Sequence, residues 1–362
     1  MRIVIINPIL YTNETSNIKK VKSIKDSMIY NLCLEFKKSG HEPLLIAAKD
    51  YMPEIDEVYD FKIQFLDTKL KKVFKPNCLP YLKGLKKYLD SIEFDCIISS
   101  EVFSINSLIV SKYYKRKLII WHELAKHNSI FNKIPSIFWY NVIARLYFRN
   151  TRIVPRSENA RLFISNYCNN VSSDYIDHGV NLNEFTFESN KENYFVVVSQ
   201  LIKRKHIDGI IIAFNDFCKK NKDYELIIIG SGEEKNNLVT LSKKINIDKK
   251  VRFLGQKTHA EIVPILSKAC ALVINTVKDN SMLTIVESIA CGTPIVTTDV
   301  PYNCDYIKKN NLGIITKKQV ESSDLISVVN KNIEFVEKCK QFRNKVSNSY
   351  HVNQFISEIS KL

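Results

Sequence analysis

The sequence lacks any uninterrupted apolar stretch of the roughly 20 residues that a membrane-spanning helix requires. Its opening segment, MRIVIINP, is broken by Pro8 too early to resemble a signal peptide. The nine cysteines are scattered singly, with neither a C-x-x-C pair nor a cluster with histidine. Isolated thiols are typical of reduced cytosolic proteins and indicate no metal site. We therefore expect a cytoplasmic protein, attached at most peripherally to the inner face of the cytoplasmic membrane.

Acidic residues are too few to balance the basic ones. The chain has 53 Lys and Arg against 38 Asp and Glu, which gives a formal net charge of +15. This excess attracts polyanions such as nucleic acids, anionic lipid headgroups or nucleotide diphosphates. Lysine far outnumbers arginine, and neither an aromatic–Arg–Gly pattern nor zinc-finger spacing accompanies it. Specific binding of nucleic acid is therefore not expected.

Strand and helix patterns alternate along the whole chain. The first apolar run, RIVII, is followed by helical spacing from Ser23 to Ser39, with Gly40 as the expected end of the helix. Several later runs, such as ALVI in ALVINT, are apolar throughout rather than alternating. That pattern predicts strands buried on both faces of a parallel sheet.

The alternation breaks once, at the polar stretch FTFESNKENY, and then restarts. Because single cores stop growing near roughly 250–300 residues, 362 residues suggest two domains. We predict an α/β protein with two doubly wound Rossmann-like domains that face one cleft. The expected divisions are a first domain at 1–185, a linker at 186–193, a second domain at 194–340 and a C-terminal helix at 341–362. This helix could cross back to the first domain.

Two turns at strand ends of the second domain could hold phosphate. SQLIKRKH places Lys203, Arg204 and Lys205 before a helix, where cations and the helix dipole suit a diphosphate. A solvated basic turn is the alternative. In IIIGSGEE, Gly230 and Gly232 would let the backbone approach a ligand closely. The fingerprint G-x-G-x-x-G is incomplete, so an ordinary tight turn is the alternative there.

The segment DNSMLTIVESIACGTPIV carries two carboxylates, Asp279 on a loop and Glu287 in the next helix. Glu287 is flanked by apolar residues, and a partly buried carboxylate needs hydrogen-bond donors such as sugar hydroxyls. In the first domain, His122 and Glu123 end the strand KLIIWHE, which would place them at the cleft. A purely structural histidine is the alternative.

A leucine stripe in LPYLKGLKKYLD (79–90) has lysines on the other faces, and KLKKVFK precedes it. This helix could lie on an anionic membrane. We favour the alternative, in which the leucines cover the first sheet.

Together these segments resemble the retaining glycosyltransferases of family 4, which have the GT-B fold. SQLIKRK is similar to that family's G-R-L-x-x-x-K turn, IIIGSGE to its I-V-G-x-G turn, and VRFLG occurs there almost unchanged. DNSMLTIVESIACGTPIV resembles its E-G-F-G-L-P-x-x-E-A-x-A-x-G-x-P-V signature. SENARLF and HGVNLNEF match two further segments in the right order.

The resemblance implies a role for each matching residue. Lys205 would hold the donor diphosphate, Glu287 the ribose hydroxyls and Asp279 the donor sugar. His122 would serve the donor sugar and the reaction centre, so His122 and Asp279 are the expected catalytic positions. The expected donor-binding positions are Gln200, Arg204, Lys205, Gly230, Gln256, Lys257, Ser281, Met282, Leu283 and Glu287, with Gln256 or Lys257 beside the base and the amides of 281–283 beside the sugar and phosphates.

Three departures from the family pattern affect this site. Gln200 replaces an arginine, for which Arg204 could compensate, and Asp279 replaces a glutamate. The glycine pair usual after the first strand is missing, and YTNETSNIKK occupies its place.

The mechanism implied is transfer with retention, without a metal or cofactor, because no D-x-D-like motif is suitably placed. The donor's own phosphate oxygen would accept the proton of the incoming hydroxyl, so we assign no protein base.

We therefore expect a hexosyltransferase that uses a nucleotide-sugar donor, a UDP-sugar by preference, and a saccharide or lipid-linked saccharide acceptor. It would serve polysaccharide or glycolipid assembly, such as lipopolysaccharide or capsule. Two alternatives remain open: a nucleotide-sugar epimerase, and a non-catalytic partner that binds nucleotide-sugar, for which Gln200 and Asp279 are the motivation.

Overall fold

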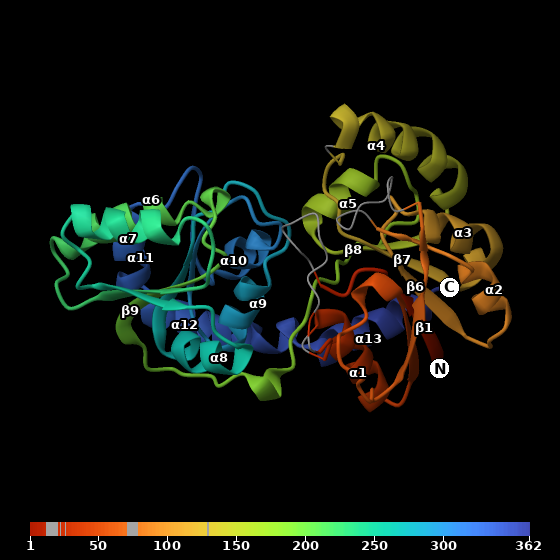
Figure 1. The fold of residues 1–362 in the computed structure, drawn as a ribbon, viewed down its shortest axis with the longest axis horizontal. Helices are drawn as coiled ribbons and strands as arrows, with labels where there is room; N and C mark the ends of the chain where they lie inside the picture. The colour runs from red at the N-terminus through yellow and green to blue at the C-terminus, as the bar shows by residue number, and fades with distance from the viewer. Residues whose placement is uncertain (12–20, 22, 26, 71–78, 129) are drawn as a thin grey trace. The chain divides into compact units, whose positions relative to one another are not determined.

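The computed structural model describes residues 1–11, 21, 23–25, 27–70, 79–128 and 130–362 (Figure 1). The chain forms two compact units. The first comprises Met1–Gly179 and Asn348–Leu362, and the second comprises Val180–Ser347. The chain thus leaves the first unit once and returns to it at its C-terminal end.

The first unit is built on a six-stranded parallel sheet with the order β3-β2-β1-β6-β7-β8. Its strands are β1 (Arg2–Ile6), β2 (Glu42–Ala48), β3 (Lys62–Leu66), β6 (Cys96–Ser100), β7 (Leu118–His122) and β8 (Arg152–Pro155), beside a small antiparallel pair of β4 (Thr68–Lys69) and β5 (Tyr81–Leu82). Its helices are α1 (Met28–Lys38), α2 (Leu85–Asp90), α3 (Ile105–Tyr114), α4 (Ile134–Phe138), the π-helical η4 (Trp139–Phe148), α5 (Glu158–Ile164) and α13 (Asn348–Ile359), with short 3-10 turns η1 (Lys49–Tyr51), η2 (Lys115–Lys117) and η3 (Ile130–Lys133).

The second unit repeats this order in its sheet, β11-β10-β9-β12-β13-β14, again with all strands parallel. Its strands are β9 (Glu192–Val198), β10 (Glu225–Ile229), β11 (Val251–Gly255), β12 (Ala269–Ile274), β13 (Ile295–Thr298) and β14 (Gly313–Thr316). Its helices are α6 (Ile207–Cys218), α7 (Lys235–Lys244), α8 (His259–Lys268), α9 (Leu283–Ala290), α10 (Cys304–Asn310), α11 (Ser322–Asn330) and α12 (Asn332–Phe342), with 3-10 turns η5 (Leu182–Glu184), η6 (Lys203–Lys205) and η7 (Arg343–Val346).

Both sheets have the strand order 3-2-1-4-5-6 of doubly wound dinucleotide-binding folds. The predicted α/β class with two Rossmann-like domains is therefore confirmed. Every residue of β12 is buried, in agreement with the prediction from its unbroken apolar run. In α1 the Ser27 hydroxyl accepts a hydrogen bond from the Tyr30 amide and begins the helix, and Gly40, at φ +80°, follows its end.

The division between the units lies at Gly179/Val180, whereas the sequence analysis put the end of the first domain at 185. Residues 180–185 are tied to the last turn of the second unit. The Val180 amide donates to the Val346 carbonyl at 2.9 Å. The Arg343 guanidinium donates to the carbonyls of Leu182 and Phe185. The stretch 186–193 likewise lies within the second unit, and α13 lies within the first.

The expected helix at 79–90 is shorter than its spacing suggested. Tyr81 and Leu82 form β5, Gly84 adopts φ +75°, and α2 begins only at Leu85. The leucines at 82, 85 and 89 are buried, so the interpretation as a core-facing stripe is confirmed. The upstream charges of KLKKVFK fall largely outside the described residues, as does most of YTNETSNIKK.

Candidate active site

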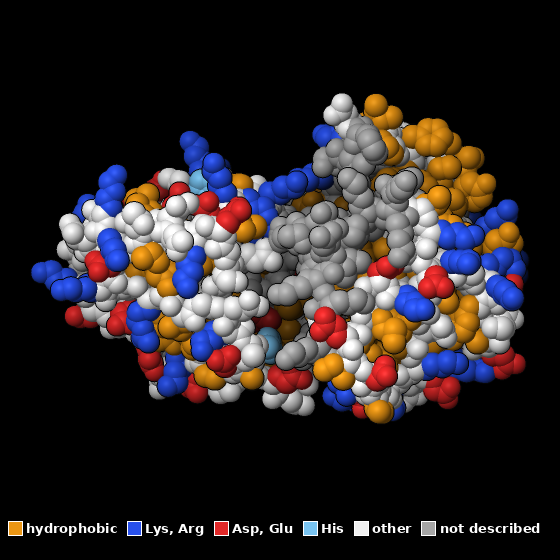
Figure 2. Space-filling model, viewed as in Figure 1, with side chains coloured by type: hydrophobic (Ala, Val, Ile, Leu, Met, Phe, Trp, Pro, Cys, Tyr) orange, Lys and Arg blue, Asp and Glu red, His pale blue; other side chains and the backbone are white. Residues whose placement is uncertain are grey.

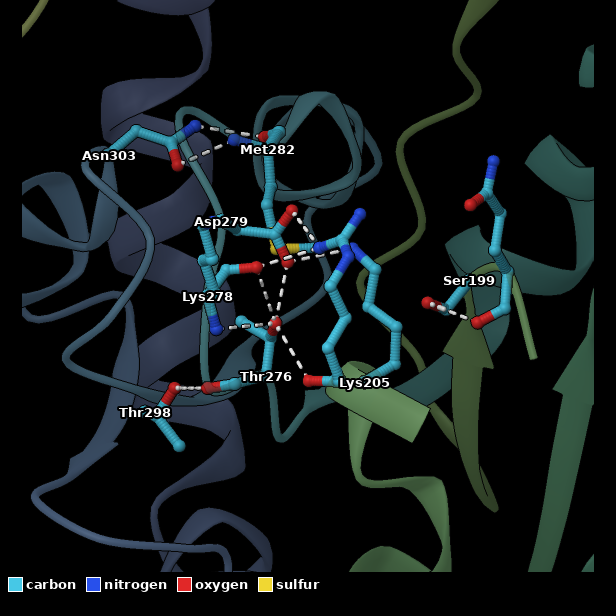
Figure 3. A network of polar contacts seen from close by, with 10 residues as sticks. Ser199, Lys205, Thr276, Lys278, Asp279, Met282, Thr298 and Asn303 are labelled. Atoms are coloured by element: carbon cyan, nitrogen blue, oxygen red, sulfur yellow. Dashed lines mark hydrogen bonds and ion pairs between the residues drawn. The ribbon is translucent and has the colours of Figure 1, made fainter. Parts of the chain in front are cut away.

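The carboxyl ends of β9 and β12 form the switch point of the second sheet, where ligands bind in doubly wound folds. The turn after β9 contains Gln200 and η6, and the loop after β12 leads through Asp279 into α9. The sequence placed both segments at strand ends, and the structure brings them into contact (Figure 3).

A cluster of two cations and one carboxylate joins these segments. Lys205 Nζ lies 2.7 Å from Asp279 Oδ2, and Arg204 Nη1 lies 2.9 Å from Asp279 Oδ1. The Thr276 hydroxyl donates to Asp279 Oδ2 at 2.6 Å. Both cations therefore point at one carboxylate, which the sequence analysis had assigned to the sugar alone (Figure 3).

The protonation of Asp279 follows from these contacts. Burial alone would raise the pKa of its carboxyl group, but hydrogen bonds from Lys205 and Thr276 outweigh burial and lower that pKa. Asp279 is therefore ionised at neutral pH and neutralises part of the positive charge of the cluster. Arg204 also donates to the carbonyl of Lys278, which fixes its guanidinium on the Asp279 side.

The glycines after β10 serve the packing of two turns. A Cβ atom on Gly230, at φ +138°, would lie 1.8 Å from the Ser199 carbonyl oxygen. A Cβ on Gly232 would lie 2.3 Å from the Leu201 carbonyl oxygen. The close approach for which these glycines are needed is thus made by the backbone of residues 199–201.

Helix α9 begins with uncommitted hydroxyl groups. The hydroxyls of Ser281 and Thr284 are buried and have no hydrogen-bond partner among the described residues. By contrast, the Met282 amide already donates to the Asn303 side chain at 3.0 Å, and Asn303 donates back to the Met282 carbonyl. Of the expected amides at 281–283, the one at Met282 is therefore occupied. Sequence reasoning missed Thr276, Thr284 and Asn303, because none carries a motif.

Glu287 is the most deeply buried carboxylate of this site, with 5% of its surface exposed. The imidazole of His259 lies beside it, with Nδ1 3.4 Å from Glu287 Oε1. Burial raises the pKa of Glu287 to about 7, so the carboxyl is partly protonated at neutral pH. Its neighbours Ile285, Ile289 and Ala290 on the same helix are fully buried.

The remaining expected donor-binding residues are Gln256 and Lys257, which follow β11, and Gln200, which follows β9. The Ser231 hydroxyl donates to Gln256 Oε1 at 3.3 Å. Lys257 Nζ donates to Glu261 Oε1 at 2.7 Å and so supports the capping box of α8. Gln200 is exposed. Lys257 thus already has a structural partner, whereas the Gln256 side chain contacts Ser231 alone among the residues that the structure describes.

The first unit carries a buried His–Glu pair at the end of β7. His122 is fully buried, and its Nδ1 lies 2.7 Å from Glu101 Oε1. Its Nε2 has no hydrogen-bond partner among the described residues. Glu101 adopts φ +67° and also accepts the Glu123 amide at 2.7 Å. Burial pushes the pKa of Glu101 up, but its interaction with His122 and the amide hydrogen bonds lower it overall.

The described residues contain no group of three or more His, Cys, Asp or Glu side chains arranged to hold a metal ion. None of the helices described is both long enough and apolar enough to cross a membrane.

The two doubly wound units define a GT-B protein, and solved structures share this architecture. Anabaena Alr3699/HepE in complex with UDP superimposes with a TM-score of 0.70 at 14% identity, over 100% of both chains. The lipopolysaccharide outer core galactosyltransferase WaaB does so with a TM-score of 0.68 at 16% identity, over 100% of both chains.

Sequence comparisons agree with this fold. Residues 181–349 match the model of the glycosyl transferases group 1. The relatives found are glycosyltransferases, and the chain is a glycosyltransferase. The alpha-monoglucosyldiacylglycerol synthase of Streptococcus pneumoniae is 23% identical over 79% of this chain and 70% of its own. WclY of Escherichia coli, an O-antigen biosynthesis glycosyltransferase, is 22% identical over 82% of this chain and 87% of its own.

Proposed function

We propose that this glycosyltransferase moves a sugar, with retention, from a UDP-sugar to a saccharide or lipid-linked saccharide in polysaccharide or glycolipid assembly. The observation that carries the proposal is the pair of cations held at the β9–β12 switch point by a single carboxylate. A diphosphate is more negative than Asp279, so it can take over both cations when it binds. The UDP complex of the Anabaena neighbour supports the choice of base.

Arg204 and Lys205 would then share the diphosphate. Gln200 removes one cation from the usual pattern, and the Arg204 guanidinium reaches the same carboxylate as Lys205. Once the diphosphate binds these cations, the Asp279 carboxylate could accept a hydrogen bond from a hydroxyl of the donor sugar. The hydroxyls of Ser281 and Thr284 offer further hydrogen bonds at the start of α9, together with the positive end of the helix dipole.

Glu287 suits the ribose of the donor. The Glu287 carboxyl, with a pKa of about 7, acts as an acceptor at both oxygens toward two vicinal hydroxyls only when it is ionised. Donor binding should therefore release a fraction of a proton near neutral pH. Gln256 and Lys257 remain the residues we propose beside the base.

The reaction exchanges one bond at the anomeric carbon for another on the same face. The bond to the diphosphate oxygen breaks, the bond to the acceptor oxygen forms, and the acceptor's proton passes to the departing phosphate. Lys205, Arg204 and the α9 dipole stabilise the charge on the leaving group without a metal or cofactor. His122 is proposed as a donor-sugar contact, and the lack of a hydrogen-bond partner for its Nε2 within the described part of the chain supports this role.

We also propose peripheral contact with an anionic membrane on the cytoplasmic side. The net charge of +15 supports it. The surface expected from residues 79–90 does not carry this contact, because its leucines at 82, 85 and 89 are buried.

The donor is tested by thermal unfolding with a panel of UDP-, GDP- and ADP-sugars. Ligand at 100 times its dissociation constant should add about 2.7 kcal/mol to the free energy of unfolding. We expect a shift of the midpoint with one UDP-sugar that disappears in Lys205→Ala and Glu287→Ala. Protection by a GDP- or ADP-sugar instead would refute the choice of base. The absence of any protection would favour the non-catalytic alternative.

A further inference from the structure

Helix α4 and the π-helix η4 that continues it form one segment, residues 134–148, with an exposed apolar face. Among the described residues, 18 large hydrophobic side chains are exposed, and six of them lie on this segment. We call them the 134–148 face: Ile134, Ile137, Phe138, Val142, Leu146 and Tyr147. Scattered exposed hydrophobic residues are common on protein surfaces, whereas a cluster of them on one segment is typical of a binding surface.

The face arises from a repeat of four residues. One row of residues spaced four apart is buried in the first unit: Ser136, Tyr140, Ala144 and Phe148. A second row with the same spacing is exposed and apolar: Ile134, Phe138, Val142 and Leu146. A π-helix is wound more widely than an α-helix, so residues four apart stay close to one line along it. The segment therefore has one side in the core and a second apolar side in solvent, which packing within the unit does not require.

The charges around the face have one sign. No Asp or Glu occurs between Glu123 and Glu158. Lys133, Arg145 and Arg149, near the two ends of the segment, are all exposed. Figure 2 shows hydrophobic side chains gathered over the part of the molecule labelled α4 in Figure 1, with Lys and Arg side chains nearby.

We propose that the 134–148 face docks the protein onto an anionic lipid bilayer, with the helical segment lying in the plane of the interface. Apolar side chains would enter the acyl boundary while the flanking cations meet lipid phosphates. A second copy of the chain fits less well, because two cationic rims would repel each other. The inference rests on the membrane contact of the proposed function and assigns it to this segment instead of α2.

Cosedimentation of the full chain with vesicles of equimolar phosphatidylglycerol and phosphatidylcholine tests this assignment. The test variant is Phe138→Glu with Leu146→Glu, whose side chains are 57% and 69% exposed. The matched control is Val58→Glu with Ile333→Glu, at 87% and 88% exposed, which makes the same change of charge elsewhere. We expect the partition coefficient to fall at least about ten-fold in the test variant, because two apolar side chains that would enter the membrane are lost. In the control it should fall less than about three-fold.

Several results would overturn the assignment. Equal losses in the two variants would mean that net charge alone governs binding. Unchanged binding of the test variant, or equal binding of the natural chain to pure phosphatidylcholine vesicles, would also refute it. A dimer of the natural chain that the test variant abolishes, without vesicle binding, would assign the face to a second copy.

The donor supplies an independent check on folding. Protection by the UDP-sugar should persist in the test variant, because no residue of the second unit is changed in it. If protection is lost as well, the variant is misfolded. The vesicle assay is then repeated with a second variant, Lys133→Gln with Arg149→Gln, which removes two of the flanking cations. Weaker binding to anionic vesicles in that variant supports the proposal, and unchanged binding contradicts it.

Discussion

The two units share one strand order and differ in what their strand ends carry. In the second unit the turns after β9 and β12 hold an ion-pair cluster and unpartnered hydroxyls. In the first unit the end of β7 holds a buried His–Glu pair among aromatic rings. Topology therefore fixes where a ligand can approach, and the side chains at the strand ends decide which chemistry is available there.

The difference also concerns how each site responds to a ligand. The cations of the second unit are neutralised by a carboxylate that a diphosphate can displace. The imidazole of the first unit is locked by Glu101, whose backbone at φ +67° is itself unusual for a side chain of this size. An exchangeable site and a rigid one thus occupy equivalent ends of similar sheets.

The largest effect should come from removing the cation that Asp279 holds most closely. We expect Lys205→Ala to lower kcat/KM by about 10²–10³, because one charge on the departing diphosphate loses its partner. The control is Lys203→Ala, which removes an exposed lysine from the same 3-10 turn. Comparable losses in both variants would show that general positive charge, and not the Lys205–Asp279 cluster, binds the donor.

Glu287 should make the stability of the second unit depend on pH. Its pKa in the folded chain, about 7, lies above its ordinary value of 4.5. The folded state therefore binds more protons, and the stabilisation present below 4.5 is lost as the pH rises through 7. The shift corresponds to roughly 3 kcal/mol. Urea midpoints measured across this interval should fall with pH in the natural chain and stay nearly flat in Glu287→Gln. The same slope in both would contradict burial of an ionisable carboxyl.

The smallest effect should come from the first unit. Glu101→Gln keeps the shape of the side chain but weakens its contact with His122 and the Glu123 amide, at a cost of about 1–3 kcal/mol. We expect a lower unfolding midpoint together with a lower kcat, since the imidazole loses the carboxylate that orients it. The donor-induced midpoint shift should be preserved. A stability loss with an unchanged kcat would leave His122 a purely structural residue.

Much of the fold could be predicted because its strands are continuous apolar runs. RIVII became β1 and ALVI became the greater part of β12. The helix expected at 79–90 was wrong at its start, since Gly84 in a left-handed conformation interrupts the periodicity there. Glycine permits that conformation, but its presence in a sequence does not by itself predict a positive φ.

The site was predicted in part for a similar reason. Residues at strand ends meet once the sheet order is known, so the proximity of the Lys205 turn to the Asp279 loop followed from topology. The attachment of both cations to Asp279, and of His122 to Glu101, depends on side-chain rotamers and on contacts distant in sequence. No local pattern encodes them.

The return of the chain to its first unit has a consequence for synthesis on the ribosome. Helix α13 brings Phe355 into the core against Phe36 and places Glu358 Oε2 2.5 Å from Arg152 Nη2. The core of the first unit therefore closes only after α13, which follows the second unit in the chain, has been synthesised. The domain that emerges later, at 180–347, is continuous and can complete its fold sooner.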